Sequence, residues 1–239
     1  MWKNINIEEC LSHINRPQNF TAADPFQVKP AITISRQCGA GGHTVASKLA
    51  EYLQAQAPLG SGWTIFDRNL IKKVLEDHLL STRLAEFVPE TGKSLLREVV
   101  EKLRGKHHPS ALKIVRQTVE TIWQLAEGGQ VILVGRAANV ITAGLKNVYH
   151  VRLVGSLDNR IERVEKVYDF DRRAALEYIR AQDAAKRLYV QDYFGRDIDD
   201  PELYHLIINT DRITYGDTAR LIGDAVINWF KLEPATKVK

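Results

Sequence analysis

A short apolar segment followed by a glycine-rich loop constrains this chain more than any other feature. Residues 31–35, Ala-Ile-Thr-Ile-Ser, are β-branched and lie between Pro30 and the glycines, which is typical of a β-strand. Residues 39–42 read Gly-Ala-Gly-Gly, and apolar residues then recur at helical spacing at 45, 49 and 53. Where a strand, a glycine loop and a helix follow in this order, backbone N–H groups and the helix dipole can converge on a phosphate.

The rest of the chain alternates between strand and helix patterns. The segment 131–134, Val-Ile-Leu-Val, is apolar on both faces, as expected for a central strand of a parallel sheet. Further strands are predicted at 63–66, 148–154 and 206–209, and helices at 157–167, 172–193 and 217–230, with another helix start at Asp200-Pro201-Glu202. This alternation predicts an α/β fold with a five-stranded, mainly parallel sheet.

One helical pattern, from residue 69 to 127, is too long for a simple crossover between two strands. We therefore predict a helical insertion at 68–128 that covers a site. The remaining organisation is an N-terminal extension at 1–28, a single α/β domain at 29–233 and a tail at 234–239. Three tryptophans fall in apolar patterns and are predicted to lie in the core, namely Trp63, Trp123 and Trp229.

Charge and cysteine content exclude several classes of protein. The chain has 33 Lys and Arg against 29 Asp and Glu, a net charge of +4 that is not concentrated in one segment. That balance does not favour nucleic acid as a partner and suits a small anion such as a nucleotide. Cys10 and Cys38 are too few for a disulfide scaffold. No segment approaches the ~18 apolar residues of a membrane span, and the start lacks a signal-peptide pattern, so we expect a cytoplasmic protein.

The glycine loop departs from the phosphate-binding consensus G-x-x-x-x-G-K-[ST]. With Gly41 on the second glycine, Arg36 takes the place of the first glycine and Gly42 the place of the lysine. His43 takes the hydroxyl position, and Thr44 follows one residue later. Because that lysine neutralises phosphate charge during phosphoryl transfer, either another cation replaces it or the chain transfers no phosphate. Arg36 and His43 are the nearest candidates.

Three parts of the chain resemble the cytidylate-kinase-like family, relatives of bacterial cytidylate kinase among the P-loop nucleoside monophosphate kinases. They are residues 34–42, residues 134–139 (Val-Gly-Arg-Ala-Ala-Asn), and a third part made of 193–195, 200–204 and 207–210. The resemblance covers about residues 30–231. It implies a P-loop NTPase-like three-layer fold with a five-stranded parallel sheet, a helical monophosphate-binding insertion and a lid at 169–196.

The resemblance also implies an ATP-dependent, Mg²⁺-assisted phosphotransferase that acts on a nucleoside monophosphate such as cytidylate, or on another small phosphate acceptor. Arg36 is then a catalytic cation. The residues that would bind ATP in the loop are Gly39, Ala40, Gly41, Gly42, His43 and Thr44. The alternative is a catalytically impaired nucleotide-binding or regulatory module, because Gly42 stands in the lysine position.

Residues at two predicted strand ends are assigned to the acceptor and the metal. Arg136 matches the arginine of the family's Gly-Arg-Asp, which holds the monophosphate, although Ala137 replaces the Asp. Its alternative is a structural ion pair with a helix carboxylate. By similarity, Asp67 helps to position Mg²⁺ and substrate, whereas the alternative is a helix N-cap. Arg68 either reaches the acceptor phosphate or lies in solvent.

A charged segment supplies the lid residues. Residues 183–187, Asp-Ala-Ala-Lys-Arg, resemble the family's Asp-x-x-Arg lid motif, with Lys186 in the arginine place. The resemblance assigns Lys186 and Arg187 to catalysis, as cations that close over the transferring phosphate. It assigns Asp183 to substrate binding and Arg160 to a phosphate contact. The alternative for all four is an exposed helix face with interleaved charges.

Overall fold

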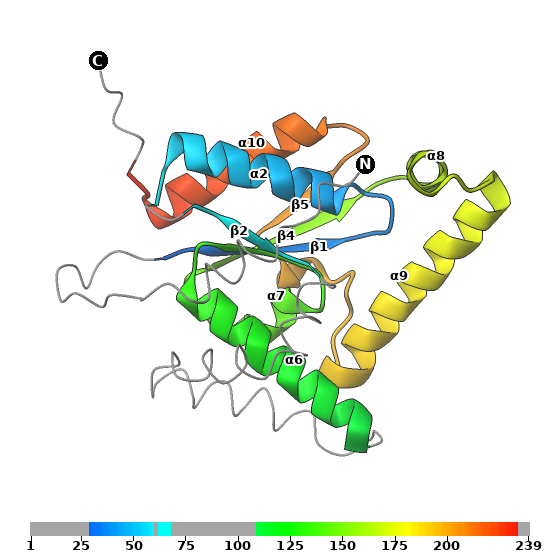
Figure 1. Ribbon diagram of the computed structural model, residues 1–239, viewed down its shortest axis with the longest axis horizontal. Coiled ribbons are helices and arrows are strands. Elements are labelled where there is room, and N and C mark those ends of the chain that lie inside the picture. Colours follow the sequence, from blue (N-terminus) through cyan, green and yellow to red (C-terminus); the bar gives the residue numbers. More distant parts are fainter. Residues whose placement is uncertain (1–28, 60–61, 68–108, 234–239) are drawn as a thin grey trace.

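The five predicted strands form one parallel sheet in the order β2-β3-β1-β4-β5 (Figure 1). The computed structural model describes residues 29–59, 62–67 and 109–233. The predicted N-terminal extension and tail, and residues 68–108 of the predicted insertion, lie outside the described residues. The fold is α/β with helices on both faces of the sheet, as predicted.

The strand boundaries agree with the sequence patterns to within one residue. They are β1 Ala31–Arg36, β2 Thr64–Phe66, β3 Val131–Val134, β4 Val148–Val154 and β5 Leu206–Asn209. The central strand, β1, pairs with β3 on one side, where Ile34 is opposite Val134, and with β4 on the other, where Arg36 is opposite Leu153. The carboxyl ends of β1 and β3 therefore lie side by side.

The helices also follow the predicted order, with two differences. They are α2 Gly42–Gln56, α6 Pro109–Gly128, α7 Ala138–Ile141, α8 Leu157–Tyr168, α9 Arg172–Phe194 and α10 Tyr215–Phe230. The short helix α7 has no sequence prediction. The helix start at Asp200 yields only the 3₁₀-helix η1 Pro201–Leu203, because the chain is already extended again at Tyr204 before β5 begins.

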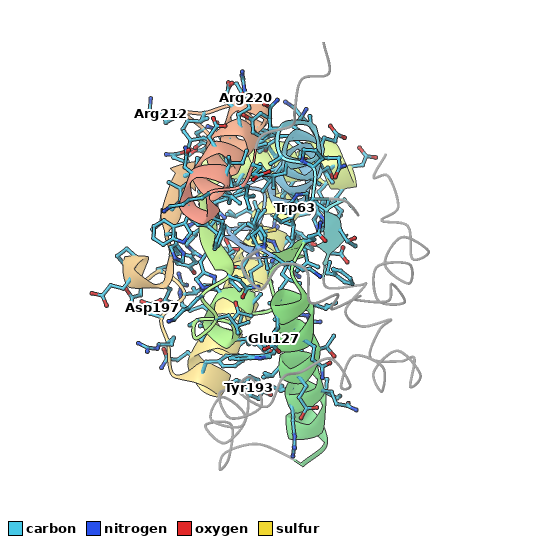
Figure 2. All side chains as sticks on the ribbon, turned by 90° about the vertical axis from the view of Figure 1, so that its left-hand side faces the viewer. Trp63, Glu127, Tyr193, Asp197, Arg212 and Arg220 are labelled. Carbon is cyan, nitrogen blue, oxygen red and sulfur yellow. The ribbon has the colours of Figure 1, made fainter. Side chains whose placement is uncertain are left out.

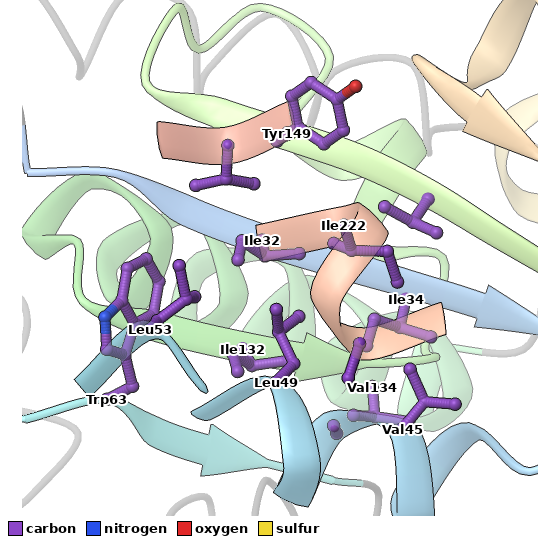
Figure 3. Packing of buried hydrophobic residues seen from close by; sticks show 14 of the residues in the cluster. Ile32, Ile34, Val45, Leu49, Leu53, Trp63, Ile132, Val134, Tyr149 and Ile222 are labelled. Atoms are coloured by element: carbon purple, nitrogen blue, oxygen red, sulfur yellow. The ribbon is translucent and has the colours of Figure 1, made fainter. Parts of the chain in front are cut away.

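Alternation along the strands divides the core into two layers. Ile32, Ile34 and Val134 point to one face and pack under α2 and α10 (Figure 3), whereas Ala31 and Leu133 point to the other face and pack against α6 and α7. All five side chains are buried. Side chains of a strand alternate between its two faces, so an apolar strand can serve both layers.

The tryptophans are placed as predicted at two positions of three. Figure 2 shows Trp63 on the side of α2 and α10. Trp123 is fully buried in the α6 layer. The prediction is wrong for Trp229, which is 59% exposed. Its ring packs edge-on against His205 and Tyr149 near β5, beyond which residues 29–59, 62–67 and 109–233 form no further strand of the sheet.

Helices α8 and α9 pack against each other beside the sheet. Their own small core is formed by Ile161, Val164, Ala175 and Ile179. The far end of α9 reaches the opposite layer, where Val190 joins the α6 and α7 core. The predicted lid at 169–196 therefore consists mainly of α9. Within the described part of the chain, no helix is long and apolar enough to cross a membrane.

Candidate functional site

The chain order places a crevice between the carboxyl ends of β1 and β3. The helix after β1 covers one face of the sheet and the helix after β3 covers the other, which makes this the topological switch point where α/β sheets bind ligands. A cavity of about 320 Å³ opens there. The polar residues of its wall come from β1, from the turn after β3, from α7 and from α9, and they include Arg36, Arg136, Asn139, Gln182, Lys186 and Tyr189.

The glycine loop beside this cavity has a backbone that only glycine fits at two positions. Gly39 and Gly41 both have φ of +80°. A Cβ on Gly39 would lie 2.6 Å from the carbonyl oxygen of Arg160, and one on Gly41 would lie 2.3 Å from the Tyr215 ring. Gly41 caps α2 without a side-chain hydrogen bond, and the first turn of α2 has no acidic residue. The first N–H groups of α2 thus remain available to an anion.

Arg36, the last residue of β1, places a partly buried guanidinium in the wall of the cavity. Burial lowers the pKa of Arg36; the charges of Cys38, Asp67 and Asp183 oppose this shift, and that of Arg136 adds to it. Among the described residues, none forms a hydrogen bond or an ion pair with this guanidinium. Arginine stays protonated in proteins, and a partly buried charge without a hydrogen-bonded counter-charge is costly, so the position suits an anionic ligand.

Arg136 follows β3 in a strained turn. Gly135, Arg136 and Ala137 all have positive φ, at 88°, 57° and 55°. Such backbone strain in non-glycine residues persists where the surroundings enforce it, and it is common at functional sites. The turn brings Arg136 close enough to Arg36 to lower its pKa. Two guanidinium groups from neighbouring strands therefore line the same cavity.

Asp183 holds α9 on the glycine loop. Its carboxylate accepts hydrogen bonds from the Cys38 N–H at 2.8 Å, from Arg160 Nη1 at 2.6 Å and from Lys186 Nζ at 3.0 Å. Arg160 also donates to the Cys38 carbonyl at 3.1 Å. Burial lowers the pKa of Lys186, and Asp183 opposes that shift. The structure thus brings three sequence-predicted residues together, but as an internal ion-paired cluster.

Arg187 lies in a different network. It pairs with Asp199 at 2.6 Å and is largely exposed. The same carboxylate pairs with the buried Arg152, which donates to Ser35 Oγ at 2.9 Å. Sequence reasoning missed Arg152, although a cation inside the apolar segment 148–154 is a usable signal. Arg187 is therefore linked through Asp199 to Arg152 of β4 and, through Arg152, to Ser35 of β1.

His43 and Asp67 meet at the other side of the loop, with His43 Nε2 3.7 Å from Asp67 Oδ2. Burial lowers the pKa of His43 below its ordinary value, Arg36 adds to the shift and Asp67 opposes it, so the imidazole is largely neutral near pH 7. No cluster of three metal-binding side chains occurs in the described ranges. Mg²⁺ needs only one or two carboxylates when phosphate and water complete its shell, so Asp67 fits this role. Arg68 lies outside the described residues.

Two further polar residues of the cavity were not given roles by the sequence. Asn139, at the start of α7, is buried, and its Nδ2 lacks a hydrogen-bond partner in the part of the chain that is described. Burial raises the pKa of Tyr189 to about 12, which keeps its hydroxyl protonated as a donor. Both are positioned by tertiary packing, so no sequence spacing could find them.

The fold and site together define a class of protein, an α/β protein whose glycine loop and two adjacent arginines lie beside a cavity at the carboxyl edge of a parallel sheet. The chain belongs to the cytidylate kinase-like family, whose model matches residues 31–212. The family resemblance seen in the sequence is therefore confirmed. Family membership supports a nucleotide-kinase-like function.

Similar proteins agree with this assignment. Cytidylate kinase from Methanocaldococcus jannaschii is 24% identical over 172 residues, covering 71% of this chain and 93% of that protein. Cytidylate kinase from Pyrobaculum neutrophilum is 24% identical over 207 residues, covering 87% and 98%. The crystal structure of an uncharacterized protein from Eubacterium ventriosum matches with a TM-score of 0.61 at 22% identity, covering 86% of this chain and 99% of that one. That likeness concerns the fold alone.

Proposed function

We propose that this protein transfers phosphate from ATP to a nucleoside monophosphate, with cytidylate as the acceptor that the family and its relatives suggest. The observation that carries the proposal is the pair Arg36 and Arg136, which line one cavity beside the glycine loop. Burial and the charge of Arg136 both lower the pKa of Arg36, and a phosphate bound beside Arg36 would oppose that shift. A cytoplasmic location remains a prediction from the sequence.

The donor triphosphate occupies the glycine loop in this proposal. The backbone N–H groups of Gly39 and of residues 41–44 surround its phosphates at the positive end of α2, whereas the N–H of Ala40 donates to the Gln37 carbonyl within the loop. Asp67 would hold Mg²⁺, which when bound neutralises part of the phosphate charge. Arg36 faces the same charge from the end of β1.

The acceptor phosphate lies against Arg136, whose planar guanidinium can hold two phosphate oxygens at once. Donor and acceptor then meet between β1 and β3, which is where a transferring phosphoryl group has to pass. Such catalysis consists of positioning and charge neutralisation, and it needs no covalent enzyme intermediate. Arg160 and Lys186 take part only when Asp183 releases them, because they are paired with it in this conformation.

An assay of ATP consumption against a panel of nucleoside monophosphates tests the proposal. We expect turnover with at least one acceptor. Changing Arg136→Ala should raise the KM for that acceptor by about tenfold or more while the affinity for ATP stays within about twofold, since the lost contact is to the acceptor. The exposed Arg212, far out on the surface in Figure 2, gives a matched control: Arg212→Ala should change neither value.

The same assay separates the alternative function. A protein that binds ATP by calorimetry but turns over with no acceptor is a nucleotide-binding or regulatory module, and that result would refute the transferase. Equal effects of Arg136→Ala and Arg212→Ala would refute only the role proposed for Arg136 and would leave the transferase proposal standing.

A further inference from the structure

Arg36 and Gly42 stand in exchanged positions relative to the phosphate-binding consensus. The consensus has glycine where this chain has Arg36, and lysine where it has Gly42. The two positions meet in space. A Cβ placed on Gly42 would lie 2.9 Å from Cγ and 3.2 Å from Cδ of Arg36. A side chain at residue 42 would therefore enter the space that the stem of Arg36 fills.

A second glycine, Gly135, leaves space for the guanidinium end of the Arg36 side chain. A Cβ on Gly135 would lie 2.0 Å from Nη1 and 3.0 Å from Cζ of Arg36. Gly135 also has a φ of +88°, so a larger residue would be strained there and would displace the end of the Arg36 side chain. The guanidinium can lie over this turn, next to Arg136, only because both glycines lack side chains.

We infer that this chain supplies its triphosphate-binding cation from the end of β1, and that Gly42 and Gly135 are the positioning residues that keep the path of Arg36 open. The inference rests on the proposed function, and it identifies the group bound by Arg36 as the β- and γ-phosphates of a nucleoside triphosphate. The cation that the consensus places at residue 42 is then supplied by residue 36 instead, because a lysine at residue 42 would collide with the side chain of Arg36.

A double-mutant cycle tests this coupling with the full chain. The variants are Arg36→Gly, Gly42→Lys and the two combined, which restores the glycine and the lysine of the consensus and keeps His43 in the hydroxyl position. We expect each single substitution to weaken ATP binding, measured by calorimetry, by at least about tenfold, because one removes the charge and the other displaces it. The combined variant should bind ATP more tightly than either single variant.

Thermal unfolding without nucleotide gives a second, independent reading. Gly42→Lys should lower the midpoint, and adding Arg36→Gly should recover part of the loss, since the collision is removed. Gly216→Lys is the matched control: Gly216 also lies in the first turn of a helix, but nothing lies closer than 3.9 Å to its Cβ position, so ATP affinity should not change. Arg36→Met keeps the apolar stem and removes the charge, so it should lose ATP affinity while its midpoint stays close to that of the native protein.

The outcomes separate this inference from the function on which it rests. Additive losses in the cycle, or unchanged ATP binding in Gly42→Lys or in Arg36→Met, would overturn the inference and leave the transferase standing. A native protein that binds no nucleoside triphosphate would overturn both.

Discussion

At the scale of the residue, the space around a single Cβ position decides which residues the glycine loop tolerates. Gly39 combines a positive φ with a Cβ position 2.6 Å from a backbone oxygen, which cannot move aside as a side chain end could. Gly195, which caps α9, has a φ of +63° but nothing within 4 Å of its Cβ position. The two glycines thus share one constraint, the backbone angle, and differ in the other.

We expect Gly39→Ala to lower the free energy of unfolding by about 2–4 kcal/mol, the sum of left-handed strain and the displaced backbone. Gly195→Ala should cost only about 1 kcal/mol, from strain alone. Denaturant unfolding measures both. Equal losses at the two positions would show that the contact with Arg160 is unimportant.

At the scale of the element, α9 is attached to the loop mainly through Asp183, whose carboxylate has three donors. Partly buried ion pairs that also satisfy a backbone N–H contribute more than exposed pairs on a helix surface, because water competes less for their partners. Glu177 on the same helix forms an exposed pair with Arg173 at 3.2 Å. The two acidic residues therefore test the attachment of α9 against helix charge in general.

Asp183→Asn should lower the free energy of unfolding by about 1–3 kcal/mol, because it leaves Arg160 and Lys186 without their shared counter-charge. It should also speed amide hydrogen exchange along α9. Glu177→Gln should change stability by less than about 0.5 kcal/mol. If hydrogen exchange in α9 is the same in both variants, Asp183 does not hold the helix.

At the scale of the whole molecule, buried histidines link folding to pH. The imidazole Nδ1 of His150, in β4, shares a hydrogen bond of 2.9 Å with the Thr33 hydroxyl, and the backbone N–H of His150 donates to Nδ1 of His205. Burial and the neighbouring His205 lower the pKa of His150 to about 4. The unfolded chain takes up this proton near pH 6.5, whereas the native protein resists it until about pH 4. Stability is therefore present above pH 6.5 and is lost as the pH falls toward 4.

The loss from His150 should reach about 3 kcal/mol between pH 7 and pH 4. His150→Gln should therefore flatten the dependence of the free energy of unfolding on pH over this range. His43 and His205 have pKa values lowered by burial as well, so a smaller slope should remain. Urea unfolding at a series of pH values measures the slope, and an unchanged slope in the variant would rule out His150 as its main source.

The sequence by itself determined the sheet, its five strands and the position of the glycine loop, because short β-branched segments and helical spacing are local patterns. It also located Arg36 and Arg136 at strand ends. Helix α7 was not predicted because a helix of four residues is too short to show a helical period. The exposure of Trp229 was not predicted because an apolar pattern in the sequence does not reveal which helix residues lie near the edge of the sheet.

Only the tertiary structure decided how the charges are arranged. Asp183 and Arg160 are 23 residues apart, and their pairing depends on how α8 and α9 pack. The meeting of Arg36 with Gly135 likewise depends on the parallel register of β1 and β3. Local patterns specify which residues are available, whereas contacts between distant segments specify which charge faces a ligand and which is already neutralised.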